Sequence, residues 1–217
     1  MRRPFDPTLY LVTDSEPAHR HALADVVAAA VRGGVTLVQL RDKRADARAL
    51  LEQAQMLKAV LDPLGVPLIV NDRADVAHAA GVGCHVGQSD LPAAAARAIL
   101  GPDAILGVSL DAAAQAHAVD PALVDYVAYG PFAATATKAD AGSPIGAAGL
   151  AAVAKLTLLP LVAIGGIDAG NVAAAVRAGA DGIAVVSAIM AASDPEGVAR
   201  ELRAAIDATK AEAEKAL

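Results

Sequence analysis

Aromatic residues and cysteine are nearly absent from this chain. It has no tryptophan, two phenylalanines, three tyrosines and one cysteine, Cys84. A single cysteine excludes an internal disulfide framework and is typical of a reducing compartment. The 217 residues are nevertheless 55% hydrophobic, with a mean hydropathy of +0.45 to which alanine contributes much. The core must therefore be packed by Val, Leu, Ile and Ala.

Long apolar runs and an excess of positive charge are also absent. No run reaches the roughly 18 apolar residues that a membrane-spanning helix needs, and Asp6 and Asp14 interrupt any signal-peptide pattern. The formal charge of −6 argues against broad nucleic-acid binding, which needs a basic face. We therefore expect a cytoplasmic protein that binds small phosphorylated molecules and neither nucleic acid nor a membrane. The sequence predicts no particular oligomeric state.

Short Val/Ile/Leu-rich runs alternate with Ala-rich segments of helical length from end to end. The expected strands are 9–12, 35–40, 67–70, 83–86, 104–108, 124–128, 160–164 and 182–186. The expected helices lie near 20–32, 46–62, 73–80, 92–100, 111–119, 146–157, 170–178 and 195–215. Continuous apolar strands are typical of a parallel sheet buried on both faces. Eight regular units without a linker predict one domain over 1–217, an α/β fold of the single (β/α)₈ TIM-barrel type; an open doubly wound sheet is the alternative.

In such a barrel the chemistry lies at the carboxyl ends of the strands. The second run leads into Gln39, Arg41 and Lys43, which alternation places on one side of the strand. Two cations and an amide at the barrel mouth suit an anionic substrate. The alternative is an ordinary charged loop in which Asp42 and Asp46 pair with the cations.

Two carboxylates follow the third and fourth runs. Asp72 and Asp90 are expected on neighbouring loops, where they could share one Mg²⁺, an ion that takes one or two protein carboxylates. The alternative is that each caps a helix, because Asp72 precedes a helical segment and Asp90 stands two residues before Pro92. The cationic loop beside the pair favours the metal. His85 is expected to be a packed, hydrogen-bonded side chain rather than a ligand.

Polar groups also follow the later runs. Ser109 lacks a Gly-x-Ser-x-Gly elbow, so we expect it to donate a hydrogen bond rather than act as a nucleophile. Thr135, Thr137 and Lys138 lie in a long Gly- and Pro-containing loop, which is typical of an anion-binding lid or of a solvated loop. Glycines and other residues with short side chains follow the last two expected strands. Their backbone N–H groups could form a phosphate-binding cup, made by Gly165, Gly166, Val186 and Ser187. Two anion sites suit a reaction that joins a diphosphate to a monophosphate.

These motifs together resemble the thiamine phosphate synthase family over nearly the whole chain. The matching segments are 9–14 (LYLVTD), 39–43 (QLRDK), 69–73 (IVNDR), 83–90 (GCHVGQSD), the 130–138 loop, 164–167 (IGGI) and 185–189 (VVSAI). Each motif alone is weak, but their order at successive strand ends is specific. The chain departs from the family pattern in two places. Relatives often have a hydroxyl or a histidine in the segment that corresponds to 110–112, and they usually have a Phe-Pro pair in the segment that corresponds to 132–134.

The resemblance implies a (β/α)₈ enzyme that condenses 4-amino-5-hydroxymethyl-2-methylpyrimidine diphosphate with hydroxyethylthiazole phosphate. Its products would be thiamine phosphate and pyrophosphate, formed by a dissociative, Mg²⁺-assisted mechanism. By the same resemblance Asp72 and Asp90 would carry Mg²⁺. The pyrimidine diphosphate would bind to Gln39, Arg41, Lys43, Asn71, Ser109 and Lys138, with Arg41, Ser109 and Lys138 catalytic. The thiazole phosphate would bind to Thr135, Thr137, Gly166, Val186 and Ser187.

Three other functions are compatible with a barrel of this kind. A thiazole tautomerase shares the phosphate cup but is not expected to keep the set of Lys43, Asn71, Asp72, Asp90 and Lys138. A non-catalytic binder of thiamine phosphate would not need the acidic and basic groups. A phosphate-sugar isomerase would want a catalytic glutamate at a strand end, and none is placed there.

Overall fold

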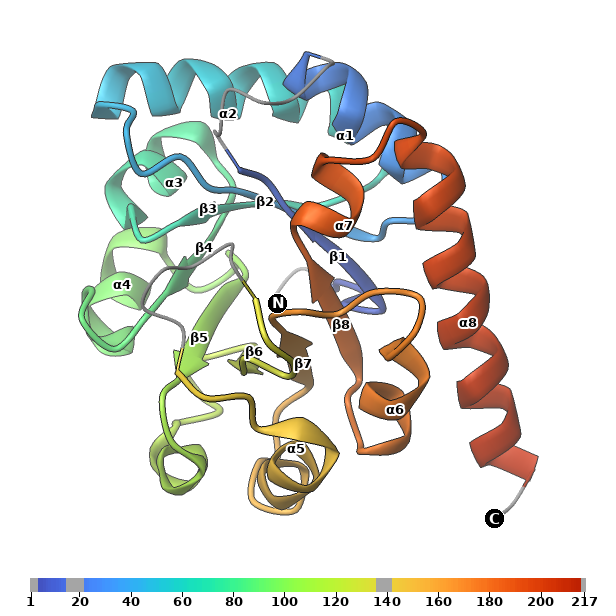
Figure 1. Cartoon of the computed structure of the whole chain (residues 1–217). Coiled ribbons are helices and arrows are strands. Elements are labelled where there is room, and N and C mark those ends of the chain that lie inside the picture. The colour runs from blue at the N-terminus through green and yellow to red at the C-terminus, as the bar shows by residue number, and fades with distance from the viewer. Residues whose placement is uncertain (1–3, 15–21, 136–141, 216–217) are drawn as a thin grey trace.

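Eight parallel strands form a closed barrel in chain order, with helices around it (Figure 1). The computed structural model describes residues 4–14, 22–135 and 142–215. The strands are β1 (Leu9–Val12), β2 (Leu37–Leu40), β3 (Leu68–Asn71), β4 (Gly83–Val86), β5 (Leu106–Leu110), β6 (Tyr126–Tyr129), β7 (Leu161–Ile164) and β8 (Gly182–Val185). β8 pairs with β1, which closes the ring, so the predicted barrel is confirmed and the open sheet is wrong. The strand bounds differ from the expected ones by only a residue or two.

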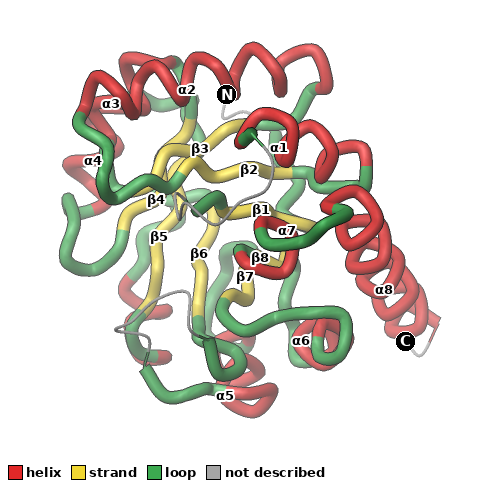
Figure 2. The backbone as a smooth tube through the Cα atoms, turned by 45° about the horizontal axis from the view of Figure 1, so that its top comes forward, coloured by secondary structure: helices red, strands yellow, loops and turns green. Residues whose placement is uncertain are grey.

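Helices cover the outside of the barrel, as Figure 2 shows. They are α1 (Leu23–Arg32), α2 (Ala47–Leu61), α3 (Ala74–Ala80), α4 (Ala93–Leu100), α5 (Gly146–Ala154), α6 (Val172–Arg177), α7 (Ser187–Met190) and α8 (Pro195–Lys215). Two short 3₁₀ helices, η1 (Asp62–Leu64) and η2 (Ala113–Ala118), complete the set within the described residues. No helix in that part of the chain combines the length and the apolar character needed to cross a bilayer.

Two helical segments differ from the sequence expectation. The segment expected as a helix over 111–119 forms the 3₁₀ helix η2, whose start is held by Gln115: its side-chain oxygen accepts hydrogen bonds from the N–H groups of Asp111 and Ala112. The short helix α7 follows β8 directly and was not predicted, because four residues are too few to show a helical periodicity.

Side-chain alternation along the strands divides the core into two parts. Outward-facing residues such as Leu11, Val38 and Leu161 pack against the helices in the larger cluster. Inward-facing residues such as Leu37, Ile69 and Val162 fill the barrel in a smaller one. Because every strand is covered on both faces, the runs read as nearly continuous apolar sequence.

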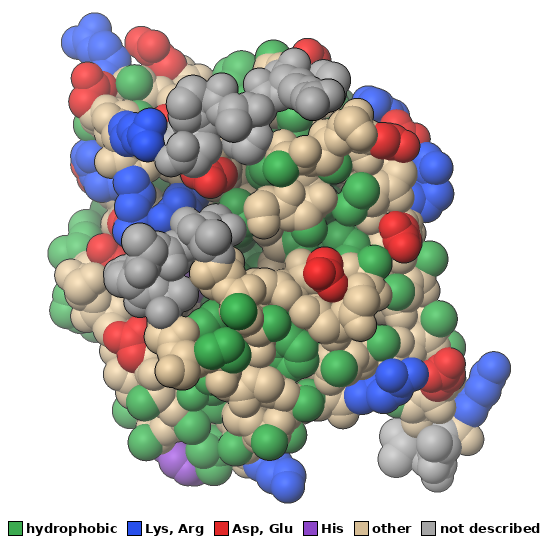
Figure 3. Space-filling view, viewed as in Figure 1, with side chains coloured by type: hydrophobic (Ala, Val, Ile, Leu, Met, Phe, Trp, Pro, Cys, Tyr) green, Lys and Arg blue, Asp and Glu red, His purple; other side chains and the backbone are tan. Residues whose placement is uncertain are grey.

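The register of neighbouring strands brings their carboxyl ends to one edge. Val70 pairs with Cys84 and Asn71 with His85, so the residues that follow β3 and β4 emerge side by side. Figure 3 shows Lys and Arg side chains beside Asp and Glu at the upper left, the side on which Figure 1 places α2 and α3. The lower part of the same view, around α5, is mostly uncharged or apolar.

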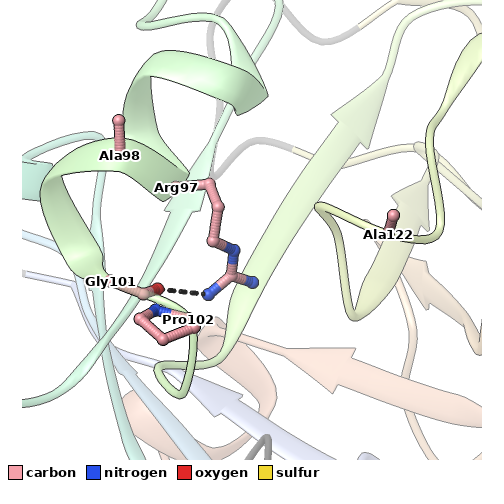
Figure 4. A pocket seen from close by; sticks show the side chains of 5 residues that line it. All are labelled: Arg97, Ala98, Gly101, Pro102 and Ala122. Atoms are coloured by element: carbon pink, nitrogen blue, oxygen red, sulfur yellow. Dashed lines mark hydrogen bonds between the residues drawn. The ribbon is translucent and has the colours of Figure 1, made fainter.

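The opposite edge, at the amino ends of β5 and β6, is held by Arg97 of α4. Its guanidinium donates to the carbonyl oxygens of Leu123 (2.8 Å), Gly101 (3.0 Å) and Ala104 (2.6 Å) and to the carboxylate of Asp125 (2.8 Å). Figure 4 shows Arg97 reaching the Gly101 carbonyl in a small hollow lined also by Ala98, Pro102 and Ala122. These bonds give Arg97 a structural role, far from the carboxyl ends where the chemistry of a barrel lies.

We predict that Arg97→Met lowers the free energy of unfolding by about 3–5 kcal/mol, because the buried Asp125 loses its cationic partner. Urea denaturation measures the loss. Arg177→Met is the matched control: Arg177 pairs with Glu212, both side chains are exposed, and the expected cost is under about 1 kcal/mol. Equal costs for the two variants would contradict the structural role of the Arg97–Asp125 pair.

Candidate functional site

The loop after β2 brings the predicted amide and cations to the carboxyl end of the barrel. Gln39 lies inside the barrel, 4% exposed, with its amide nitrogen 2.5 Å from the Tyr10 hydroxyl, to which it donates. The backbone N–H of Arg41 donates to Thr13 Oγ1 (3.0 Å), which anchors the start of the loop to the end of β1. Arg41 is half-buried and Lys43 is exposed, so their positive charge lies between the interior and the surface.

The aspartates of the same loop hold its backbone. Asp42 accepts hydrogen bonds from the N–H groups of Arg44 (3.0 Å) and Ala45 (3.2 Å) and from the Gln53 side chain. Asp46 is the N-cap of α2 and accepts from Ala49 (2.9 Å). These contacts give both carboxylates a local structural role.

Asp72 and Asp90 meet at the ends of β3 and β4. Burial, a side-chain hydrogen bond between the two carboxyls and the charge of Asp90 raise the pKa of Asp72 to about 6. The positive charges of Lys43 and Arg41 oppose this rise, which places both cations near Asp72. Asp72 also has a left-handed backbone (φ 64°), and its N–H donates to the His85 carbonyl (2.7 Å). A non-glycine residue held in this conformation is a feature of many functional sites.

Neither aspartate caps a helix. The N-cap of α3 is Arg73 and that of α4 is Pro92, and neither end has a side-chain capping bond. Asp90 instead accepts the N–H of Gly87 at 2.7 Å within its own turn. The capping alternative is therefore wrong for both residues.

The paired carboxylates suit a divalent cation. Two carboxyls in hydrogen-bond contact disfavour each other's ionised form, and a bound cation would relieve that repulsion. Within residues 4–14, 22–135 and 142–215, no group of three or more His, Cys, Asp or Glu side chains could hold a metal. A site with two carboxylates fits Mg²⁺, which keeps several waters or substrate oxygens as its other ligands.

A chain of polar side chains crosses the barrel interior below these loops. The Tyr10 and Tyr126 hydroxyls are 2.8 Å apart, Tyr126 lies 2.8 Å from His85 Nδ1, and His85 Nε2 lies 2.8 Å from Ser109 Oγ. The expectation that His85 is a packed, hydrogen-bonded side chain is confirmed. Burial lowers its pKa to about 4, so the imidazole is neutral at physiological pH. It also raises the pKa of Tyr10 and Tyr126, so both phenols keep their protons.

Sequence reasoning missed the two tyrosines. Tyr10 and Tyr126 are 116 positions apart, and neither was assigned a role from the sequence. One signal was present: all three tyrosines of the chain fall on strands, Tyr10 in β1 and Tyr126 and Tyr129 at the two ends of β6, and the other residues of both strands are aliphatic. A buried hydroxyl in such a position needs a partner.

The ends of β7 and β8 form the second part of the site. Gly165 and Gly166 have φ values of 93° and 66°, and Val186 and Ser187 join β8 to α7. The loop after β6 lies against this turn: Phe132 and Ala133 donate their N–H groups to the carbonyls of Ile164 and Gly165, both at 2.9 Å.

Close packing requires a glycine at position 166. A Cβ on Gly166 would lie 2.5 Å from the Ala134 carbonyl oxygen and 2.6 Å from that of Ala133. The turn after β7 is therefore fitted to the loop that leads to Thr135. Thr137 and Lys138, the other predicted residues of that loop, lie outside the described residues.

The structure thus brings the predicted residues together in two groups at one end of the barrel. The charged group lies at β2–β5, and its members are Gln39, Arg41, Lys43, Asn71, Asp72, Asp90 and Ser109. The uncharged group lies at β6–β8, with Thr135, Gly166, Val186 and Ser187.

Comparison with known proteins gives one consistent result. A family model described as thiamine monophosphate synthase matches residues 9–189. The thiamine-phosphate synthase of Xanthobacter autotrophicus is 58% identical over 97% of this chain and 100% of its own length, and that of Azorhizobium caulinodans is 51% identical with the same coverage.

Solved structures agree with this match. A thiamine phosphate pyrophosphorylase from Pyrococcus furiosus superimposes with a TM-score of 0.84 at 31% identity, over 94% of this chain and 96% of that one. A 3-hexulose-6-phosphate synthase, with a TM-score of 0.66 and 23% identity, shares the fold alone. With a family model over most of the barrel and full-length relatives above half identity, the chain belongs to the thiamine monophosphate synthase family.

Proposed function

We propose that this chain, an enzyme that forms thiamine phosphate and releases pyrophosphate, binds its two substrates on opposite sides of the barrel mouth. The pyrimidine diphosphate takes the charged side at β2–β5, and the thiazole phosphate takes the uncharged side at β6–β8. The observation that carries this proposal is the contact between the Asp72 and Asp90 carboxyls beside two cations, across the mouth from a glycine turn. A diphosphate with a divalent cation fits the first arrangement, and a monophosphate held by backbone N–H groups fits the second.

Asp72 and Asp90 would hold Mg²⁺, which would neutralise charge on the diphosphate. Arg41 and Lys43 supply further positive charge on the same side, with Lys138 proposed to join them. Gln39, Asn71 and Ser109 offer hydrogen-bonding groups at the inner edge and hold the pyrimidine end of the substrate. Ground-state binding alone would not speed the reaction, so these cations matter most as charge builds on the departing pyrophosphate.

The chemistry follows from these residue types. The bond between the pyrimidine methylene carbon and the diphosphate oxygen breaks first, and its electron pair leaves with pyrophosphate. The lone pair of the thiazole nitrogen then forms the new carbon–nitrogen bond. No activated protein nucleophile is required, in agreement with Ser109 lying in a hydrogen-bonded chain without a carboxylate. The loop that carries Thr135 and Thr137 would keep water away from the cationic intermediate.

On the uncharged side, Thr135, Thr137, Gly166, Val186 and Ser187 would bind the thiazole phosphate. Backbone N–H groups suit this task because they can hold the phosphate and orient the thiazole nitrogen without adding a cation. The positively charged side chains then stay on the β2–β5 side, where the diphosphate binds. Two alternatives, a thiazole tautomerase and a non-catalytic binder, are less well supported. The similar curated proteins carry the synthase name, and Lys43, Asn71, Asp72 and Asp90 are all present. A cytoplasmic location stays a prediction.

We predict that the purified protein forms thiamine phosphate from the two substrates only when Mg²⁺ is present. Product formation, followed by chromatography of thiamine phosphate, should stop in excess chelator and return when Mg²⁺ is restored. Turnover that is undiminished after metal removal would refute the metal assignment while leaving the synthase activity intact.

Asp72→Asn should lower kcat/KM by about 100-fold or more, since a lost metal ligand removes several kcal/mol of charge stabilisation. Asparagine tolerates the left-handed backbone at this position. The matched control is Asp46→Asn, which removes the same charge from a neighbouring loop while the amide oxygen still caps α2. A normal rate in Asp72→Asn, or an equal loss in both variants, would contradict the role of Asp72.

Asp72→Asn should also change how the stability of the metal-free protein depends on pH. The Asp72 pKa is raised in the folded state, so metal-free wild-type protein loses stability as pH rises from about 4, the unfolded value, through about 6. Without metal, Asp72→Asn should be more stable than wild type above pH 6 and show little advantage near pH 4. Urea denaturation at both pH values checks this sign.

Gly166→Ala should raise KM for the thiazole phosphate, because the new Cβ forces the Ala133 and Ala134 carbonyls away. The control is Gly65→Ala: Gly65 has a φ of 68°, close to the 66° of Gly166, but no atom within 4 Å of the added Cβ. Both variants carry a similar backbone cost of about 1–2 kcal/mol. Steady-state kinetics should separate them, and an unchanged KM in Gly166→Ala would show that this turn does not shape the thiazole site.

A further inference from the structure

The five side chains of the interior chain come from five different strands. Gln39 lies on β2, Tyr10 on β1, Tyr126 on β6, His85 on β4 and Ser109 on β5. Each is joined to the next by a hydrogen bond of 2.5–2.8 Å, and all but Ser109 are buried. The chain therefore links two proposed substrate-binding residues, Gln39 and Ser109, through three that have no assigned role.

With the Gln39 amide nitrogen facing Tyr10, the donors and acceptors in this chain run in one direction. The Gln39 amide nitrogen donates to the Tyr10 oxygen, so the single Tyr10 hydrogen is left for Tyr126, its other partner among the described residues. Tyr126 accepts that bond and has one hydrogen of its own, which is left for His85 Nδ1.

The direction fixes the histidine tautomer. Because Nδ1 accepts from Tyr126, the proton of the neutral imidazole lies on Nε2 and is donated to Ser109 Oγ. The serine oxygen accepts this bond, and its own hydrogen is therefore available to the barrel mouth. Ser109 is also held from outside, because the Gln88 side chain donates to its carbonyl oxygen at 2.7 Å.

The absence of a side chain at Gly107 leaves the space that the Tyr126 ring occupies. Gly107 is paired with Tyr126 in the sheet, and a Cβ on Gly107 would lie 2.0 Å from Tyr126 Cζ. The Tyr126 ring stacks on His85 with centroids 5.5 Å apart and 30° between the planes. Every buried side-chain nitrogen and oxygen in the described part of the chain has a partner. A polar chain through an otherwise apolar interior is costly to bury unless every member is hydrogen-bonded, and this one joins two proposed substrate-binding residues, which points to a role beyond folding.

We propose that His85 is a positioning residue that acts through Ser109: the Gln39–Tyr10–Tyr126–His85 chain sets the direction of its hydrogen bonds so that the Ser109 hydroxyl donates to an acceptor atom of the pyrimidine diphosphate. The ring nitrogens and the diphosphate oxygens of this substrate are such acceptors. The inference rests on the proposed function for the identity of the ligand, but the orientation of the chain is a property of the free protein.

The first test reads the tautomer without any activity. In ¹⁵N NMR of the imidazole groups, the His85 signals, assigned by their loss in His85→Gln, should show a bare Nδ1 and a protonated Nε2. Tyr126→Phe removes the hydrogen that Nδ1 accepts and should bring in the Nδ1-protonated form. Tyr10→Phe keeps the Tyr126–His85 bond but removes the donor that fixes its direction, so it too should bring in the Nδ1-protonated form, as a mixture with the wild-type tautomer. Protonated Nδ1 in wild-type protein would overturn the proposal.

The second test asks whether His85 acts through Ser109. The side chain of His85→Asn can reach Tyr126 but not Ser109, and should lower kcat/KM for the pyrimidine diphosphate by about tenfold, the loss of one hydrogen bond. His85→Gln can place its amide at the Nε2 position and should keep most of the activity. KM for the thiazole phosphate should not change in either variant.

A double-mutant cycle with Ser109→Ala completes the test. In the Ser109→Ala background, His85→Asn should cause no further loss, because the group through which it acts is gone. Additive losses, or equal losses in His85→Asn and His85→Gln, would overturn the positioning role and leave a structural one. If the protein did not form thiamine phosphate at all, the kinetic arm would fail while the tautomer result would stand, so the two failures can be told apart.

Discussion

The closed ring of parallel backbone hydrogen bonds is the constraint on which this site depends. Parallel pairing in a fixed register brings all eight carboxyl ends to one edge of the barrel, so residues far apart in the sequence share one mouth. The pairing of Asn71 with His85 sets the ends of β3 and β4 side by side, and the turn in which Asp90 accepts the Gly87 N–H brings its carboxyl to Asp72. A shift of one residue in that pairing would turn the inward-facing side chains toward the helices.

The unfavourable electrostatic interactions of the barrel mouth are found at the Asp72–Asp90 pair, where we propose that the metal binds. Burial and the contact with Asp90 raise the pKa of Asp72, so its ionised form is disfavoured in the free protein, yet the pair fits a cation that a diphosphate can share. The left-handed backbone of Asp72 adds to that cost. Across the mouth the Gly165–Gly166 turn offers only backbone groups, so the two halves of the proposed site differ in charge, as the two proposed ligands do. At the other edge of the barrel, Arg97 binds the segments that precede β5 and β6, and it contributes to neither half of the proposed site.

The fold was readable from the sequence because buried parallel strands leave a simple pattern of short apolar runs. The position of the carboxylate pair followed from the same pattern, since Asp72 and Asp90 end neighbouring strands. The capping alternative could be rejected only from the structure, which shows where α3 and α4 begin. The interior chain could not be predicted: whether Tyr10 and Tyr126 face each other depends on barrel closure and on the space left at Gly107. The short helix α7 left no periodic signal.

The most direct measurement of the central claim is a crystal structure of the enzyme with Mg²⁺, pyrophosphate and the thiazole phosphate. The account predicts the metal between the Asp72 and Asp90 carboxylates, with pyrophosphate on the side of Arg41 and Lys43. The thiazole phosphate should lie against the Gly166 turn and the start of α7. A metal bound elsewhere, or both phosphate groups on the same side of the mouth, would contradict it.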